Sequence, residues 1–217
     1  MQRLINEDVL LSLAVVLLAG VSPNIFPIAQ AGLAPMSVLA VRLLLPSIVL
    51  IATVFALANV RGHRRLATHM LLGAAAGVIA TAGLEVVRAA SFRLGGMPGD
   101  LPRLLGVLLT DRFMLGPSTL SDALGYTYHF WNGACFGLIF AVLFGRKPLI
   151  WTAAYGELVG LGFLASPAVK AMGVGFMALQ MPAMIVTVLA AHLVFGLVLG
   201  LLLRRWLHDG WLLAPGA

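Results

Sequence analysis

Two histidines occupy matching positions in two apolar segments of the chain. His129 begins the segment HFWNGACFG and His192 begins HLVFGLVLG, so each histidine precedes two glycines at intervals of four residues. Residues four apart share one face of an α-helix, and each histidine is therefore expected on the same face as its glycines. Two neutral imidazoles that face each other could bind a metal ion or hold a haem iron axially. Asn132, about one turn from His129, could orient that ring through its second nitrogen.

The same two histidines also suit roles that need no cofactor. In a cavity they could transfer a proton or hydrogen-bond a solute. At a helix contact, each could instead hydrogen-bond across the interface as a structural link. The sequence leaves these alternatives open for His129 and His192.

Four charged residues form two pairs with helical spacing. Glu85 and Arg88 lie three residues apart inside an apolar segment, and Asp100 and Arg103 repeat that interval in a connection. Side chains three apart on a helix are neighbours, so each pair is predicted to form an ion pair. The alternative for Glu85 is a carboxylate that exchanges partners along a transport path. Ionisable groups within apolar segments are costly, which makes them candidates for a functional site.

No motif of a common catalytic system occurs in the sequence. It contains no H-E-x-x-H, no G-x-S-x-G, no phosphate-binding loop and no dinucleotide fingerprint. We therefore do not expect an enzyme, although a reaction on lipid within the membrane, with His129 or Glu85 as the base, stays an alternative.

Composition assigns the chain to the membrane proteins. Of its 217 residues, 61% are hydrophobic and 10% are charged, and the mean hydropathy is +1.02. Soluble domains carry about 25% charged residues. Apolar runs close to the ~20 residues that a helix needs to cross a bilayer recur along the chain. The net charge of +6 comes from basic residues at the ends of these runs, where membrane topology requires them, so the expected partner is the lipid bilayer and not nucleic acid.

Six transmembrane helices account for the apolar runs, which makes the fold class an all-α membrane protein. Residues 1–65 would hold two leading helices, the first of them interrupted by Pro23 and Pro27 and retained, although a cleaved signal peptide is the alternative. Residues 66–205 would form a four-helix unit, and 206–217 a short cytoplasmic tail. The six predicted helices span residues 8–30, 36–60, 67–92, 123–145, 149–169 and 182–203.

The distribution of lysine and arginine predicts the orientation. With the N-terminus inside, eight basic residues flank the helices on the inner side and four on the outer side. The excess favours two cytoplasmic termini. The long connection between the third and fourth helices is then extracytoplasmic. Within it, residues 101–114 are apolar with scattered charges and too short to span, which predicts an amphipathic helix on the membrane surface or a cap over the bundle.

Each of the last four predicted helices contains one G-x-x-x-G motif. Small residues let helix backbones approach closely in lipid, so these motifs predict helix contacts. Because histidines precede the motifs in the fourth and sixth helices, the four helices are interpreted as two copies of one hairpin, related by an axis along the membrane normal. The predicted packing glycines are Gly73, Gly77, Gly133, Gly137, Gly156, Gly160, Gly196 and Gly200.

The polar side chains of the bundle are expected in its outer half. Contacts between the glycines would close the inner half, and residues 101–114 would cover the top of an outward-facing polar cavity. The function that follows is binding or transport of a small solute or ion. The alternatives are a bis-histidine haem or metal protein and a structural or assembly protein, the last favoured if the charges neutralise one another. The candidate cavity residues are His129, His192, Glu85, Arg88, Asn132, Asp100 and Arg103.

One resemblance adds to this interpretation. The segments AGVIAT at 76–81 and LPRLLG at 101–106, together with the two histidine–glycine segments, resemble small bacterial integral membrane proteins grouped under domains of unknown function. The resemblance covers residues 73–205 and omits the first two helices. It implies a four-helix membrane unit in a bacterial inner membrane, and no activity.

Overall fold

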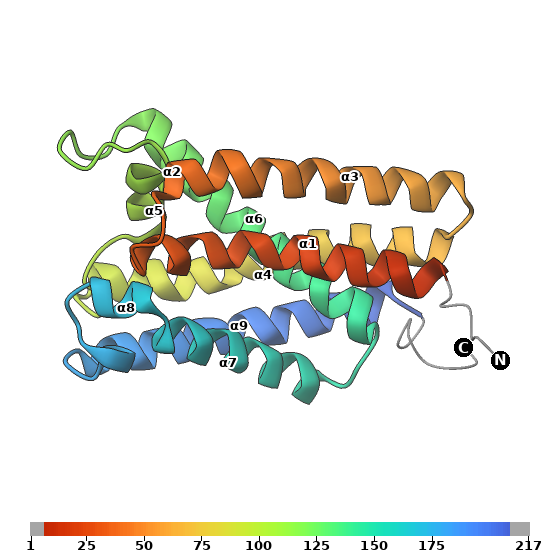
Figure 1. The fold of residues 1–217 in the computed structure, drawn as a ribbon. Coiled ribbons are helices and arrows are strands. Elements are labelled where there is room, and N and C mark those ends of the chain that lie inside the picture. Colours follow the sequence, from red (N-terminus) through yellow and green to blue (C-terminus); the bar gives the residue numbers. More distant parts are fainter. Residues whose placement is uncertain (1–6, 209–217) are drawn as a thin grey trace.

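The computed structural model describes residues 7–208, and within this range every regular element is helical. Figure 1 shows long helices running roughly side by side; α1 begins and α9 ends at one end of the bundle, and α2, α5 and α8 gather at the other. Most of the predicted cytoplasmic tail lies outside the described residues. The elements are α1 (Glu7–Gln30), α2 (Met36–Leu39), η1 (Ala40–Leu44), α3 (Leu45–Val60), α4 (Arg64–Arg93), α5 (Leu101–Leu109), α6 (Thr119–Phe144), α7 (Leu149–Ala165), α8 (Pro167–Ala171), η2 (Phe176–Ala178) and α9 (Pro182–Trp206).

Five helical stretches within residues 7–208 are long and apolar enough to cross a membrane. They are α1, the continuous stretch Met36–Val60, α4, α6 and α9. Leu149–Ala165, which was predicted as part of the fifth of six spans, has 17 residues and is shorter than these five. Large apolar side chains point out of the bundle, such as Leu17 at 74% and Val186 at 68% exposure. Apolar surface of this extent suits lipid and not water.

Prolines lie within α1, near the start of α3 and directly after α7. The helix α1 continues through Pro23 and Pro27, so the predicted interruption is wrong, and both prolines lie beside the cavity described below. A π-helical turn, η1, precedes Pro46, which has no N–H to donate to the preceding turn. The predicted fifth helix ends at Ala165 and not at residue 169, because Ser166 precedes Pro167 and takes an extended conformation, with ψ at 156°.

Glycines bring α4 and α6 into backbone contact. A Cβ atom added to Gly77 would lie 2.1 Å from the carbonyl oxygen of Gly133, and one added to Gly137 would lie 2.3 Å from the carbonyl oxygen of Gly73. Real Cβ atoms do not approach so closely, so the two helices tolerate no side chain at these positions. The contact is therefore one of main chain against main chain.

The helices α7 and α9 meet in the same manner. A Cβ atom on Gly156 would lie 2.3 Å from the carbonyl oxygen of His192, and one on Gly196 would lie 2.3 Å from that of Thr152. The ring of His192 covers Gly160, at 3.0 Å from the position of an added Cβ. His192 thus stands at the edge of this helix contact.

The two hairpins do not pack against each other symmetrically. The helix α4 packs along α9, whereas aromatic side chains separate α6 from α7. The Tyr155 hydroxyl of α7 donates a hydrogen bond of 3.1 Å to the Phe136 carbonyl of α6, and the rings of Tyr155 and Phe140 lie 5.2 Å apart. The wider α6–α7 separation leaves space in the bundle.

The connection between α4 and α6 forms one short helix. The helix α5 ends at Leu109, five residues before the predicted end, and Thr110 and the left-handed Asp111 follow it. It packs on α6 through two glycines that sequence reasoning did not single out. A Cβ on Gly106 would lie 1.8 Å from the Ser121 carbonyl oxygen, and one on Gly125 would lie 2.0 Å from that of Pro102.

The other end of the bundle is held by charges. His63 Nδ1, at the start of α4, lies 2.6 Å from Asp8 Oδ1, and Arg61 forms an ion pair with Glu7. These contacts tie the first turn of α1 to the turn between α3 and α4.

The backbone contact of α4 with α6 leads to a stability prediction. Gly77→Ala is expected to lower the free energy of unfolding by ~1–3 kcal/mol, because the added methyl group forces the helices apart. Thermal or denaturant unfolding in detergent measures the change. Gly20→Ala in α1 is the matched control, since nothing lies within 4 Å of its added Cβ. Equal stability of the two variants would contradict the prediction.

Candidate functional site

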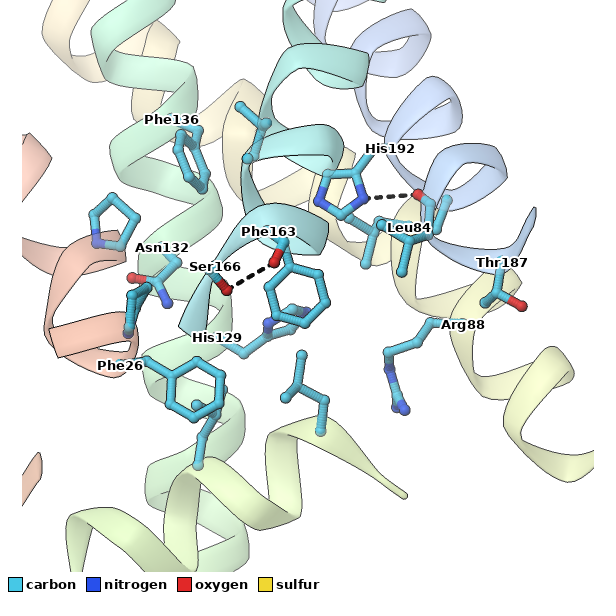
Figure 2. A pocket seen from close by; sticks show the side chains of 18 of the residues that line it. Phe26, Leu84, Arg88, His129, Asn132, Phe136, Phe163, Ser166, Thr187 and His192 are labelled. Carbon is cyan, nitrogen blue, oxygen red and sulfur yellow. Dashed lines mark hydrogen bonds between the residues drawn. The ribbon is translucent and has the colours of Figure 1, made fainter. Parts of the chain in front are cut away.

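A cavity of about 340 Å³ lies between the helices, at the end of the bundle that α5 covers. Figure 2 shows its side chains converging from several helices on one space. Its wall is largely apolar, with polar groups set into it, so the predicted polar cavity is only partly polar. The lining residues are Pro23, Asn24, Phe26, Pro27, Leu84, Arg88, Met97, Leu101, Leu105, His129, Asn132, Phe136, Val159, Gly162, Phe163, Ser166, Thr187, Val188, Ala191 and His192.

A smaller cavity of about 60 Å³ shares five of these residues and reaches further along the helices. Gly133 also lines it, and Gly133 is one of the residues at which α4 and α6 touch. The open space therefore extends from α5 to the level where the backbones of α4 and α6 meet.

One buried arginine holds two carboxylates beside the cavity. The Arg88 Nε and Nη2 groups donate hydrogen bonds of 2.6 and 2.8 Å to the two carboxylate oxygens of Glu85. The Nη2 atom also lies 3.1 Å from Asp100 Oδ1. Arg88 is 4% exposed, and its third nitrogen, Nη1, has no hydrogen-bond partner among the described residues. The predicted Glu85–Arg88 neighbourhood is thus present, and Asp100 joins it.

His129 completes this cluster from α6. Its Nε2 atom lies 2.9 Å from Glu85 Oε1, an ion-pair distance without the alignment of a hydrogen bond. Charge attraction acts over such a distance whenever the imidazole is protonated. The carboxylate of Glu85 therefore lies between Arg88 on its own helix and His129 on the next.

Arg103 and Asp100 do not pair, contrary to the prediction from their spacing. Arg103 donates hydrogen bonds of 3.0 and 2.8 Å from its Nε and Nη2 to Asp122 Oδ2 at the start of α6. This carboxylate raises the pKa of the Arg103 guanidinium above its usual range. Asp100 precedes α5 in the chain and turns towards Arg88, so tertiary proximity and not helical spacing selects its partner. Arg103 lies outside the cavity wall.

The His192 ring forms a hydrogen bond within its own helix, α9. Its Nδ1 is 2.8 Å from the carbonyl oxygen of Val188, and because a carbonyl only accepts, this nitrogen carries the proton. In the neutral ring Nε2 is then an acceptor. The two histidines line both cavities but make no hydrogen bond with each other.

Asn132 connects α6 with α1. Its side-chain oxygen accepts a hydrogen bond of 2.5 Å from the Ser22 hydroxyl, and the Tyr128 hydroxyl donates one of 2.7 Å to the Ser22 carbonyl. The sequence offered Asn132 or a backbone carbonyl as the partner of a histidine ring; the Asn132 oxygen binds Ser22, and a backbone carbonyl, that of Val188, binds His192. Sequence reasoning missed Ser22 and Tyr128; their only signal was that they are polar residues within apolar segments.

The arrangement of the histidines bears on the metal alternative. Within residues 7–208, no group of three or more His, Cys, Asp or Glu side chains is placed to hold a metal ion. The Nε2 atom of His129 faces Glu85, whereas the hydrogen bond of His192 is made by its other nitrogen, Nδ1. The geometry thus gives each histidine a different surrounding.

Two substitutions in the charge cluster should lower the stability of the protein by different amounts. Arg88→Gln should destabilise the protein by up to about 3–5 kcal/mol, because it leaves two half-buried carboxylates without their cation. Glu85→Gln should cost clearly less, since Arg88 keeps Asp100 as a partner. Thermal unfolding of both variants in detergent tests the order. Arg103→Gln, at an exposed ion pair, serves as the control and should change little. Equal losses for Arg88 and Glu85 would refute this account of the cluster.

The resemblance to bacterial membrane proteins, which the short segments suggested, gains no support from comparison with known proteins. No protein-family model, no curated protein and no solved structure matches the chain.

Proposed function

We propose that the protein binds a small solute in the cavity beside Arg88 and passes it across or along the membrane. The observation that carries this proposal is a cavity of about 340 Å³ whose wall includes Arg88, and one buried nitrogen of its guanidinium has no partner within residues 7–208. Ligand pockets of about 300–1,000 Å³ combine an apolar wall with a few convergent polar groups, as here. A buried N–H without a partner is costly, and a ligand that accepts a hydrogen bond would remove that cost.

A structural role is the second candidate, and one observation favours it. Glu85, Arg88 and Asp100 largely neutralise one another, as they would in a bundle built only for stability. The cavity distinguishes the two roles, because a purely structural cluster needs no open space beside it. We therefore prefer solute binding.

For the membrane arrangement we propose six crossings, with α7 and the short α8 together forming the fifth. The close glycine contacts would act as G-x-x-x-G packing sites in lipid. Lysines and arginines gather near the turn between α3 and α4 and around the turn between α6 and α7, as at Arg64, Arg65, Arg146 and Lys147. The positive-inside rule places this end in the cytoplasm and the cavity end outside.

Cysteine labelling tests this orientation. In a Cys135→Ala background, a membrane-impermeant maleimide applied to intact cells should label Met114→Cys, at 95% exposure near α5, and not His208→Cys after α9. Permeabilised cells should label both. Labelling of His208→Cys alone in intact cells would reverse the proposed topology.

Solute binding is tested by filling the cavity. Mass spectrometry of small molecules that copurify with the protein in nanodiscs should detect a bound species that is lost in Gly162→Phe. Gly162 lines the cavity and has open space where a side chain would begin. Leu158→Phe on the same helix, at a position 66% exposed, is the matched control and should retain the species. If no species depends on Gly162, solute binding is refuted and the structural role stands.

A further inference from the structure

We propose that the solute is an uncharged, single-chain amphiphile with hydroxyl and carbonyl groups at its polar end, which enters from the bilayer between α1 and α7. The inference rests on the proposed function, since it names the chemical class of the ligand that this cavity takes. Four features of the cavity point to it: its rim, the charges beside it, the hydrogen-bonding groups of its wall and its apolar lining.

The rim of the cavity includes exposed residues of two helices, α1 and α7. Asn24 of α1 and Gly162 of α7 both line the cavity and are both exposed. The helix α1 contacts the short α8, whereas aromatic side chains hold α7 away from α6. An opening between two transmembrane helices faces lipid, so a bilayer component reaches it without crossing water.

The charge balance next to the cavity disfavours an anionic head group. Arg88 already has two carboxylates, Glu85 and Asp100, as ion-pair partners. An anion would be a third negative group around a single guanidinium in a medium of low dielectric constant. A cation is disfavoured as well, because the guanidinium of Arg88 lines the cavity whereas neither Glu85 nor Asp100 is among the lining residues.

The polar groups of the wall include a donor and an acceptor. Nη1 of Arg88, a buried nitrogen, is a donor that has no partner among the described residues. Nε2 of His192 is an acceptor, because the proton is on Nδ1. A carbonyl oxygen satisfies the Arg88 donor, and a hydroxyl satisfies the His192 nitrogen as well.

The remaining wall suits one hydrocarbon chain. Three phenylalanines, Phe26, Phe136 and Phe163, line it with aliphatic side chains between them. At about 340 Å³, the cavity is near the lower end of the range for ligand pockets, which favours one acyl chain over the two of a phospholipid.

Photolabelling with a matched set of lipids tests the inference. The protein in nanodiscs receives one of four probes with the same diazirine-bearing dodecyl chain: monododecanoylglycerol, methyl dodecanoate, dodecanoic acid at mildly alkaline pH, or dodecylamine. We expect the glycerol ester to label cavity peptides of α6 and α7 roughly tenfold more than the acid or the amine, because a charge must be desolvated next to the cluster. Methyl dodecanoate, which only accepts hydrogen bonds, should label at an intermediate level.

Two variants assign the effect to named atoms. His192→Phe removes the acceptor but breaks no tertiary hydrogen bond, so the glycerol ester should fall to the level of methyl dodecanoate. Arg88→Lys keeps the charge and removes Nη1, so labelling by both esters should fall. If His192→Phe leaves the preference for the glycerol ester unchanged, the assignment of the hydroxyl to His192 is wrong.

The outcomes separate this inference from the proposed function. Cavity labelling that is strongest with the acid or the amine overturns the uncharged ligand but leaves solute binding in place. Labelling confined to the lipid-facing positions Leu158 and Leu161 with every probe overturns entry from the bilayer. If, in addition, unlabelled short-chain esters from water displace the copurified species, the cavity binds a soluble compound. If no species copurifies either, both proposals fail.

Discussion

The contact of bare backbones between α4 and α6, and between α7 and α9, is the constraint on which the rest of the structure depends. At Gly77 and Gly156, the neighbouring helix leaves no room for a side chain. Lipid provides little hydrophobic drive for helix association, so such close approach must supply it through van der Waals contact. Because these two pairs are tight while aromatic rings hold α6 and α7 apart, the space in the bundle opens between α6, α7 and α1.

The charged cluster has a second effect, on the connection that covers the cavity. Asp100 immediately precedes α5 and lies 3.1 Å from Nη2 of Arg88 on α4. The glycine contact of Gly106 with α6 holds the same short helix from its other side. Leu101 and Leu105 thereby line the cavity. The ion pairs of Arg88 therefore also position the helix that covers the cavity.

Arg88 is not fully paired within the described residues, and the proposed function depends on this. For stability, every nitrogen of a buried guanidinium should have a partner, because an unpaired buried donor is costly. Here two nitrogens serve Glu85 and one of these also serves Asp100, while Nη1 has none among the described residues. The proposed solute would supply the missing acceptor. The two histidines differ in a similar way. His129 lies beside Glu85 in the charge cluster, whereas His192 lines the cavity and is not part of the cluster.

The sequence by itself determined the helical class, the apolar segments and the Glu85–Arg88 neighbourhood, because helix periodicity and hydropathy are local properties. The tertiary structure alone decided that Asp100 pairs with Arg88 and Arg103 with Asp122, since partners 12 and 19 residues apart depend on how α4, α5 and α6 pack. It also decided that the matching histidines have unlike surroundings. Equal spacing in two helices fixes the helix face of a side chain, but the neighbouring helix supplies its partner.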